Sequence, residues 1–176
     1  EVQTGMGRLG TLFGYQRFDG VEPDVMTLGK ALGAGAPLGA FASKDFCSVL
    51  EPGDHGSTFG GNALSTAAGA AAAKFIVDND VPALASTGGA YLTAKLTQLA
   101  EKYSFISDIR GLGLLIGIEM TKEIAAPTVQ ECLGNGLLIN AVRPNMLRFM
   151  PPLNVTEKEI DEAIQILDTS LANTSK

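Results

Sequence analysis

The sequence changes character at Asn62, and this change constrains the fold more than any other feature. Before it, clusters of glycine separate short apolar runs at residues 25–28 and 38–42, which predict short buried strands joined by tight turns. After it, residues 63–77 are almost all small or apolar, which favours a helix packed closely against a sheet. Asn62 is a suitable N-cap for that helix. Together these patterns predict an α/β fold.

The second half of the sequence predicts a long helix followed by a smaller unit. A terminal helix is the clearest element, because Thr156 and Glu159 form a capping box ahead of an apolar stripe. Gly88 and Gly89 are a candidate interruption of the long helix. The other expected elements are a helix over 81–101, strands over 109–120 and 137–149, and a helix over 127–133. We therefore expect residues 1–101 to form part of a large α/β domain with its linking helix, and residues 102–176 to form a small α+β domain.

Charge, cysteine count and hydropathy exclude several classes of function. The 13 Lys and Arg against 19 Asp and Glu give a net charge of −6 and a pI near 4.7, so the chain lacks the basic stripe that nucleic-acid binding needs. The longest apolar run, residues 67–73, is alanine and glycine and is too short to span a membrane. Cys47, Cys132 and the single His55 provide neither a disulfide framework nor a metal site, so we expect two reduced thiols.

Two glycine-rich segments match nucleotide-binding loops only in part. Gly5–Gly10 has the glycine spacing of a dinucleotide-binding loop, but its neighbours do not predict the strand and helix that such a loop connects. A nicotinamide-dependent oxidoreductase is therefore the third hypothesis. The segment Gly33–Pro37 is not a P-loop, because no Ser or Thr follows Gly29 and Lys30.

Three basic residues are candidates for chemistry or for structure. Lys30 ends an apolar run and enters a glycine-rich turn, so it is either a solvated surface lysine or a Schiff-base nucleophile. Arg148 lies at the end of an apolar strand, where an arginine usually pairs with a carboxylate of the protein or of a ligand. We interpret Arg110 as structural, either paired with Asp108 or tying the two domains together.

The segment His55–Asn62 offers an anion site just ahead of the helix. It contains the hydroxyls of Ser57 and Thr58 and several glycine amides. Free N–H groups and the positive end of the helix dipole attract phosphate. A turn followed by an ordinary helix cap explains the same residues equally well.

Four segments together resemble the fold-type I, class III pyridoxal-phosphate aminotransferases. The order and spacing match along the whole chain, which corresponds to the C-terminal part of such an enzyme. Within the class, residues 55–62 and 138–145 are most similar to acetylornithine aminotransferases, with ornithine and 4-aminobutyrate aminotransferases next. The four segments are Glu1–Arg8, Pro23–Lys30, His55–Asn62 and Arg148–Pro152.

The resemblance implies a ping-pong amino transfer from N-acetylornithine, or a related ω-amino substrate, to 2-oxoglutarate in arginine biosynthesis. Lys30 would bind pyridoxal 5'-phosphate covalently as a Schiff base and move the proton between substrate and cofactor. Arg148 would bind the α-carboxylate of the substrate. The enzyme would be a homodimer that acts on small molecules. We expect a cytoplasmic protein by default, and no metal because the chain has too few cysteines and histidines.

The resemblance also assigns four residues to cofactor binding. Val2 would pack on the pyridine ring, and Gln3 would hydrogen-bond the phenolic oxygen. Thr58, with Ser57, would bind the phosphate, usually across the dimer interface. In this way the resemblance implies an active site shared between two subunits.

The first segment lacks one member of the family pattern. An aspartate that pairs with the pyridinium nitrogen precedes the Glu-Val-Gln run in the family, and here the chain begins at Glu1. We therefore expect these residues alone to have at most feeble transaminase activity. A non-catalytic binding or assembly module that retains the fold is the second hypothesis.

Overall fold

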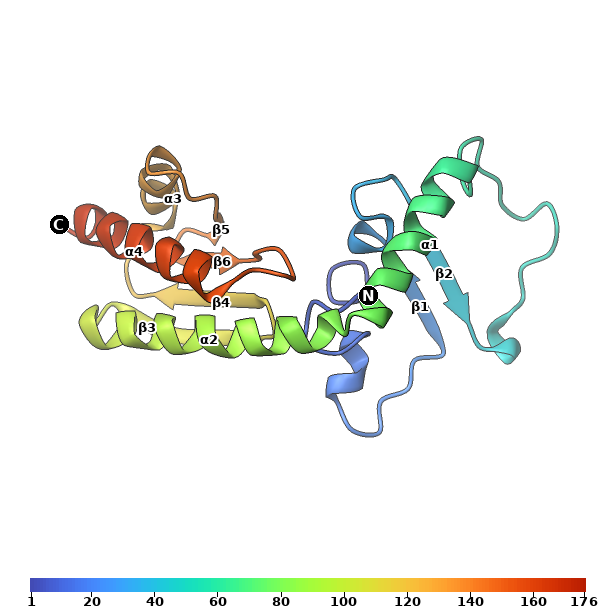
Figure 1. The fold of residues 1–176 in the computed structure, drawn as a ribbon, viewed down its shortest axis with the longest axis horizontal. Helices are drawn as coiled ribbons and strands as arrows, with labels where there is room; N and C mark the ends of the chain where they lie inside the picture. The colour runs from blue at the N-terminus through green and yellow to red at the C-terminus, as the bar shows by residue number, and fades with distance from the viewer. The chain divides into compact units, whose positions relative to one another are not determined.

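The computed structural model describes all residues, 1–176, and they divide into two compact units, residues 1–83 and 84–176 (Figure 1). The division falls near the start of helix α2, Val81–Lys102. The domain boundary predicted from the sequence, at residue 101, lies near the other end of this same helix. The assignment of residues 1–101 and 102–176 to two functional domains stays a prediction.

The first unit has a two-stranded antiparallel ribbon, in which Leu28 pairs with Ala40 and Val25 with Ser43. The strand expected at 25–28 is confirmed, and the strand expected at 38–42 begins two residues later. The prediction that both are buried is wrong: Phe41 is 58% exposed, because the two strands pair only with each other. The unit contains strands β1 Val25–Leu28 and β2 Ala40–Ser43, 3-10 helices η1 Gly14–Arg17, η2 Lys30–Gly33 and η3 Asp45–Cys47, and helix α1 Ala63–Asp78.

The predicted N-cap of α1 is confirmed. The Asn62 Oδ1 atom accepts a hydrogen bond from the Ser65 backbone N–H at 2.9 Å, which satisfies one of the donors left free at a helix start. The helix packs closely against η2 and the residues that follow it. A Cβ atom at Gly69 would lie 2.3 Å from the Leu38 Cδ2 atom and 3.2 Å from the Leu32 carbonyl oxygen, so a larger residue here would displace the Leu38 side chain.

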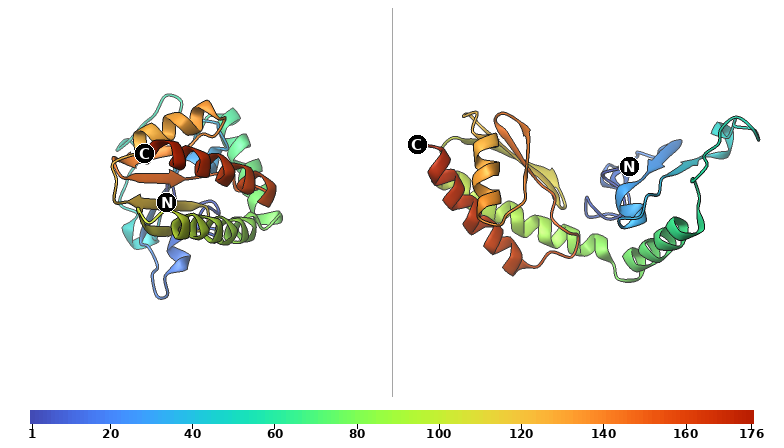
Figure 2. Two further views of the ribbon diagram at one scale, coloured as in Figure 1. Left: turned by 90° about the vertical axis from the view of Figure 1, so that its left-hand side faces the viewer. Right: turned by 90° about the horizontal axis from the view of Figure 1, so that it is seen from above.

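The second unit is a four-stranded antiparallel sheet in the order β3-β4-β6-β5. Helices α2 and α4 lie along one face of this sheet (Figure 2), and α3 packs on α4 and β5. No helix combines the length and hydrophobicity that spanning a bilayer requires. The elements after α2 are β3 Ile106–Leu112, β4 Leu115–Met120, α3 Ala125–Gly134, β5 Asn140–Arg143, β6 Met146–Phe149 and α4 Glu157–Thr174.

The two apolar segments for which the sequence predicted strand structure, 109–120 and 137–149, each form two strands joined by a turn. The segment 109–120 reverses at Gly113, whose φ of 53° lies in the left-handed region that glycine adopts readily. The segment 137–149 reverses at Pro144 and Asn145, between β5 and β6. Hydrophobic content alone does not mark these reversals, because apolar residues occur on both sides of each turn.

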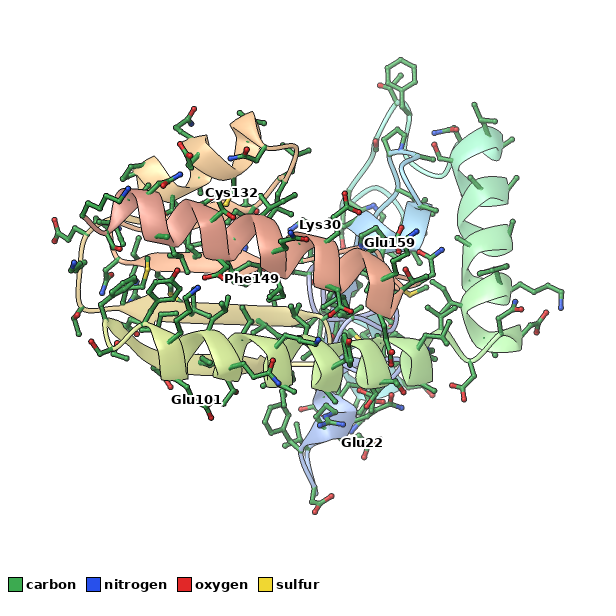
Figure 3. All side chains as sticks on the ribbon, turned by 60° about the vertical axis from the view of Figure 1, so that its left-hand side comes forward. Glu22, Lys30, Glu101, Cys132, Phe149 and Glu159 are labelled. Carbon is green, nitrogen blue, oxygen red and sulfur yellow. The ribbon has the colours of Figure 1, made fainter.

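The core of this unit lies between the helices and the sheet. The core side chains come from alternate residues of β4 and β6, so one sheet face carries apolar side chains toward α2 and α4. Cys132 and Phe149, both labelled in Figure 3, belong to this core. Both cysteines are free thiols, as expected, although Cys47 is only half-buried. The predicted capping box of α4 is confirmed, and Gly88 and Gly89 do not interrupt α2.

Candidate active site

The first residues fold into turns that are organised by the Glu1 side chain. Its carboxylate accepts hydrogen bonds from the Gly14 and Tyr15 backbone N–H groups, at 3.0 and 2.9 Å, and from the Thr4 hydroxyl. Burial opposes ionisation of Glu1, but these hydrogen bonds outweigh it and lower the pKa of the carboxyl group. The ionised side chain therefore fixes the shape of the loop that contains Val2 and Gln3.

This N-terminal loop lies against the carboxyl end of β1. A Cβ atom at Gly29 would be 3.4 Å from the Val2 Cγ1 atom, and one at Gly5 would be 3.3 Å from the Leu28 side chain. The structure thus brings Val2 next to the backbone that leads into Lys30. Gln3 follows in the same turn and is half-buried.

Lys30, labelled in Figure 3, begins η2 and is separated from the end of β1 by Gly29 alone. Its φ of 48° is in the left-handed region, which costs a non-glycine residue on the order of 1 kcal/mol. The side chain is exposed and forms no ion pair with any carboxylate of the chain. A strained backbone therefore presents an amine without an ion pair near the end of a strand, one residue after the Gly29 backbone that Val2 approaches.

Ser57 and Thr58 lie in an exposed loop ahead of α1. The Ser57 Oγ atom accepts a hydrogen bond from the Gly60 backbone N–H at 2.9 Å, and the Asn62 side chain donates to the Phe59 carbonyl oxygen at 2.9 Å. These contacts make a turn and a helix cap. No hydrogen bond joins Ser57 or Thr58 to Lys30 in the described residues, so their role in phosphate binding stays a prediction.

Arg148 belongs to the second unit and lies on the sheet face turned away from the helices. Its neighbours Leu147 and Phe149 point into the core, and side chains alternate along a strand. The Arg148 Nη2 atom donates to the Asn140 Oδ1 atom at 3.5 Å, while its Nε atom is buried without a hydrogen-bond partner. No carboxylate of the chain pairs with Arg148, so it retains donors for an anionic ligand.

Arg110 has the first of the two structural roles expected from the sequence, an ion pair with Asp108. It pairs with Asp108 and, through Nη2, with the Glu119 Oε2 atom at 2.6 Å. Hydrogen bonds to these two carboxylates raise the pKa of Arg110. The contact with Asp108 confirms the predicted pair, while the contact with Glu119 comes from the register of β3 and β4.

The structure also bears on the Gly5–Gly10 segment and on Asn140. The Gly5–Gly10 segment forms turns and connects no strand to a helix, so it is not a dinucleotide-binding loop. Asn140, the neighbour of Arg148, was missed. The signal was available, because residues 140 and 148 are placed symmetrically about Pro144 and become partners once the segment is a hairpin.

Comparisons with known proteins agree with the four matching segments. The family model for class-III aminotransferases matches residues 1–171. The chain is 49% identical over 172 residues to the acetylornithine aminotransferase of Caldanaerobacter subterraneus subsp. tengcongensis, covering 98% of this chain and 44% of that protein. It is 45% identical over 169 residues to the acetylornithine aminotransferase of Methanocaldococcus jannaschii, covering 96% of this chain and 42% of that protein. It therefore spans less than half the length of these relatives.

Solved structures give the same result. The acetylornithine aminotransferase from Elizabethkingia anophelis matches with a TM-score of 0.90 at 34% identity, over 98% of this chain and 44% of that one. The ornithine delta-aminotransferase of Plasmodium falciparum matches with a TM-score of 0.91 at 34% identity, over 99% and 45%. The fold class expected from the sequence, a part of a pyridoxal-phosphate aminotransferase, is thereby confirmed. On the match of residues 1–171 to the family model, this chain belongs to the class-III aminotransferases.

Proposed function

We propose that the protein containing this chain is a pyridoxal-phosphate-dependent aminotransferase that transfers an amino group from N-acetylornithine to 2-oxoglutarate. The observation that carries the proposal is Lys30, which is exposed, forms no ion pair and has a strained backbone directly after the Gly29 that Val2 approaches. The chain is a family member whose curated relatives include acetylornithine aminotransferases. Ornithine and 4-aminobutyrate are the alternative amino donors. We further propose that the reaction serves arginine biosynthesis in the cytoplasm.

The residues of this chain fit the cofactor. Covalent attachment of an aldehyde needs an amine without a competing carboxylate, and Lys30 meets that condition. Val2, 43% exposed, offers an apolar surface for the ring, with the Gln3 amide in the same turn. In this proposal Ser57 and Thr58 bind the phosphate. When bound, pyridoxal phosphate supplies an electron sink for the substrate carbon that loses a proton.

Two side chains of this chain act on the substrate in the proposed mechanism. The Lys30 Nζ atom would accept the proton from the substrate Cα as a general base and would then give that proton up as a general acid. Arg148 binds the substrate carboxylate, for which its guanidinium is available because it forms no ion pair with a carboxylate of this chain. The carboxylate holds the substrate in one orientation while the proton moves.

We propose a homodimer with a shared active site as the working form. Large apolar side chains of the first unit are exposed: Phe59 at 81%, Leu64 at 82% and Phe46 at 72%. Exposed apolar groups of this size are typical of surfaces that another polypeptide covers. The loop with Ser57 and Thr58 lies immediately beside Phe59, which fits a phosphate site built across the subunit interface.

The covalent role of Lys30 can be tested by mass spectrometry. The protein is incubated with pyridoxal phosphate, reduced with borohydride and digested, and the pyridoxyl group is located by peptide mapping. We expect it on Lys30 and not on Lys44, a matched lysine of the same unit that is paired with Glu22 and Asp24. Lys30→Ala should abolish the adduct. Labelling spread evenly over the lysines, or absent from Lys30, would refute the assignment.

Substrate choice requires a separate assay. The reduced adduct reports only on the cofactor, so amino transfer to 2-oxoglutarate is measured with N-acetylornithine, ornithine and 4-aminobutyrate as donors. We expect the largest kcat/KM for N-acetylornithine. A larger value for either other donor would replace the proposed substrate and leave the aminotransferase assignment in place.

A further inference from the structure

The sheet face that carries Arg148 also carries a second arginine in the same cross-strand row. Arg110 on β3 pairs with Gly117 on β4, Gly117 pairs with Arg148 on β6, and Arg148 pairs with Asn140 on β5. Residues directly opposite each other on neighbouring strands point to the same face. The two guanidinium groups therefore share one face, with only a glycine between their positions.

The two arginines differ in their partners. Arg110 is bound by the carboxylates of Asp108 and Glu119, whereas Arg148 has only the neutral Asn140 side chain at 3.5 Å. The hydrogen bond and charge of Arg110 lower the pKa of Glu119, so this carboxylate is ionised at neutral pH. One arginine is neutralised and the other is left for an external anion.

Glu119 is also close to Arg148. It lies two residues from Gly117 on the same strand and therefore on the same face, directly opposite Met146. Arg148, two residues beyond Met146, is its diagonal neighbour, at a Cα distance of roughly 7–8 Å that long side chains bridge. Gly117 places no side chain in this space, and the side chain nearest to it is the flexible end of Met146, whose Sδ atom also lies 3.7 Å from the Arg110 Nη2 atom. A Glu119 carboxylate released from Arg110 could reach the Arg148 guanidinium.

We propose that Arg110 is a positioning residue for the substrate-carboxylate site: by holding Glu119, it prevents an internal ion pair with Arg148 and keeps that guanidinium free. This inference rests on the proposed role of Arg148 in binding the substrate carboxylate. Arg110 itself does not contact the substrate in this arrangement. Its removal therefore has an effect only while Glu119 carries its charge.

The test is a charge-removal cycle in the complete protein. The variants are Arg110→Met, Glu119→Gln and the double variant, with Arg110→Gln as a second form if the methionine variant loses native circular dichroism. Lys95→Met is the matched control, because it removes a cation that pairs with Asp161 on the helical side of the unit. Two quantities are measured: the rate at which phenylglyoxal modifies Arg148, located by peptide mass spectrometry, and the KM for 2-oxoglutarate.

The proposal predicts one pattern across the cycle. Arg110→Met should slow modification of Arg148 and raise the KM about fivefold, the factor expected for a partly exposed ion pair, with kcat nearly unchanged. The double variant should have the wild-type rate of Arg148 modification and the wild-type KM. The single variants Glu119→Gln and Lys95→Met should also have wild-type values of both quantities. An Arg110→Met variant with unchanged Arg148 reactivity and KM, or a double variant that does not recover, would overturn the inference.

The modification rate separates this inference from the proposed function. A wild-type protein that transfers no amino group would refute the proposed function, while the phenylglyoxal pattern would still report whether Arg110 keeps Glu119 from Arg148. If the enzyme is active but the Arg110→Met substitution leaves the rate of Arg148 modification unchanged, the inference is refuted and the proposed function is not.

Discussion

Two adjacent glycines in α2 should respond to alanine in opposite directions. A Cβ atom at Gly88 would lie 3.6 Å from side-chain atoms of Leu114 and Val155, which is ordinary van der Waals contact. Alanine is the better helix former by about 1 kcal/mol, so Gly88→Ala should increase the free energy of unfolding by about that amount. At Gly89 the new Cβ would lie 2.1 Å from the Gly113 carbonyl oxygen.

The close contact at Gly89 is with backbone, so no side chain can turn aside to relieve it. The helix-propensity gain of about 1 kcal/mol remains, but overpacking of this kind costs about 3 kcal/mol. Gly89→Ala should therefore lower the free energy of unfolding by about 2 kcal/mol, and the two variants should differ by about 3 kcal/mol. Glycine at 89 is required because the turn of the β3–β4 hairpin rests directly on the helix.

Urea unfolding followed by far-ultraviolet circular dichroism measures both changes, with the wild-type protein as reference. Equal midpoints for the two variants would refute the reasoning, because it would mean that the hairpin moves away from the helix without cost. A Gly88→Ala variant less stable than wild type would show that the space beside Leu114 and Val155 is smaller than the structure indicates.

Two further predictions concern α4. Thr156→Ala removes the capping-box hydroxyl that accepts from the Glu159 backbone N–H and should cost about 1 kcal/mol of unfolding free energy, whereas Thr156→Ser should retain most of it in the same urea titration. Burial disfavours ionised Asp168, but hydrogen bonds from Lys102 and Tyr103 outweigh it and lower its pKa below the ordinary 3.8. Its contribution to stability is therefore present above that ordinary value and lost as pH falls through the lower folded-state pKa. Asp168→Asn should lower stability near neutral pH and flatten the acid side of a stability-against-pH profile, and an unchanged profile would contradict this.

Local signals in the sequence predicted several elements because short-range chemistry decides them. Asn62 and the pair Thr156 and Glu159 cap their helices through hydrogen bonds within a few residues, and both caps are confirmed. The strand at 25–28 and the long helix from Val81 follow from local composition in the same way. The hairpin turns at Gly113 and Pro144 were missed, because apolar content continues across them while the chain reverses.

The candidate site also has some features that the sequence predicts and others that depend on tertiary packing. The residues of the four segments and the amine of Lys30 could be identified from the sequence, because chemical type and spacing are written there. The left-handed backbone of Lys30 and the contact of Val2 with Gly29 depend on how the N-terminal loop packs on the end of β1.

The cross-strand row of Arg110, Gly117, Arg148 and Asn140 was likewise decided only by tertiary structure, since register joins residues that lie far apart in the chain. By itself, the sequence determined the chemical groups, the helix caps and the family. Only tertiary structure decided which arginine is neutralised and which stays free, because the Coulomb energy of a charge depends on its distance from other charges in space.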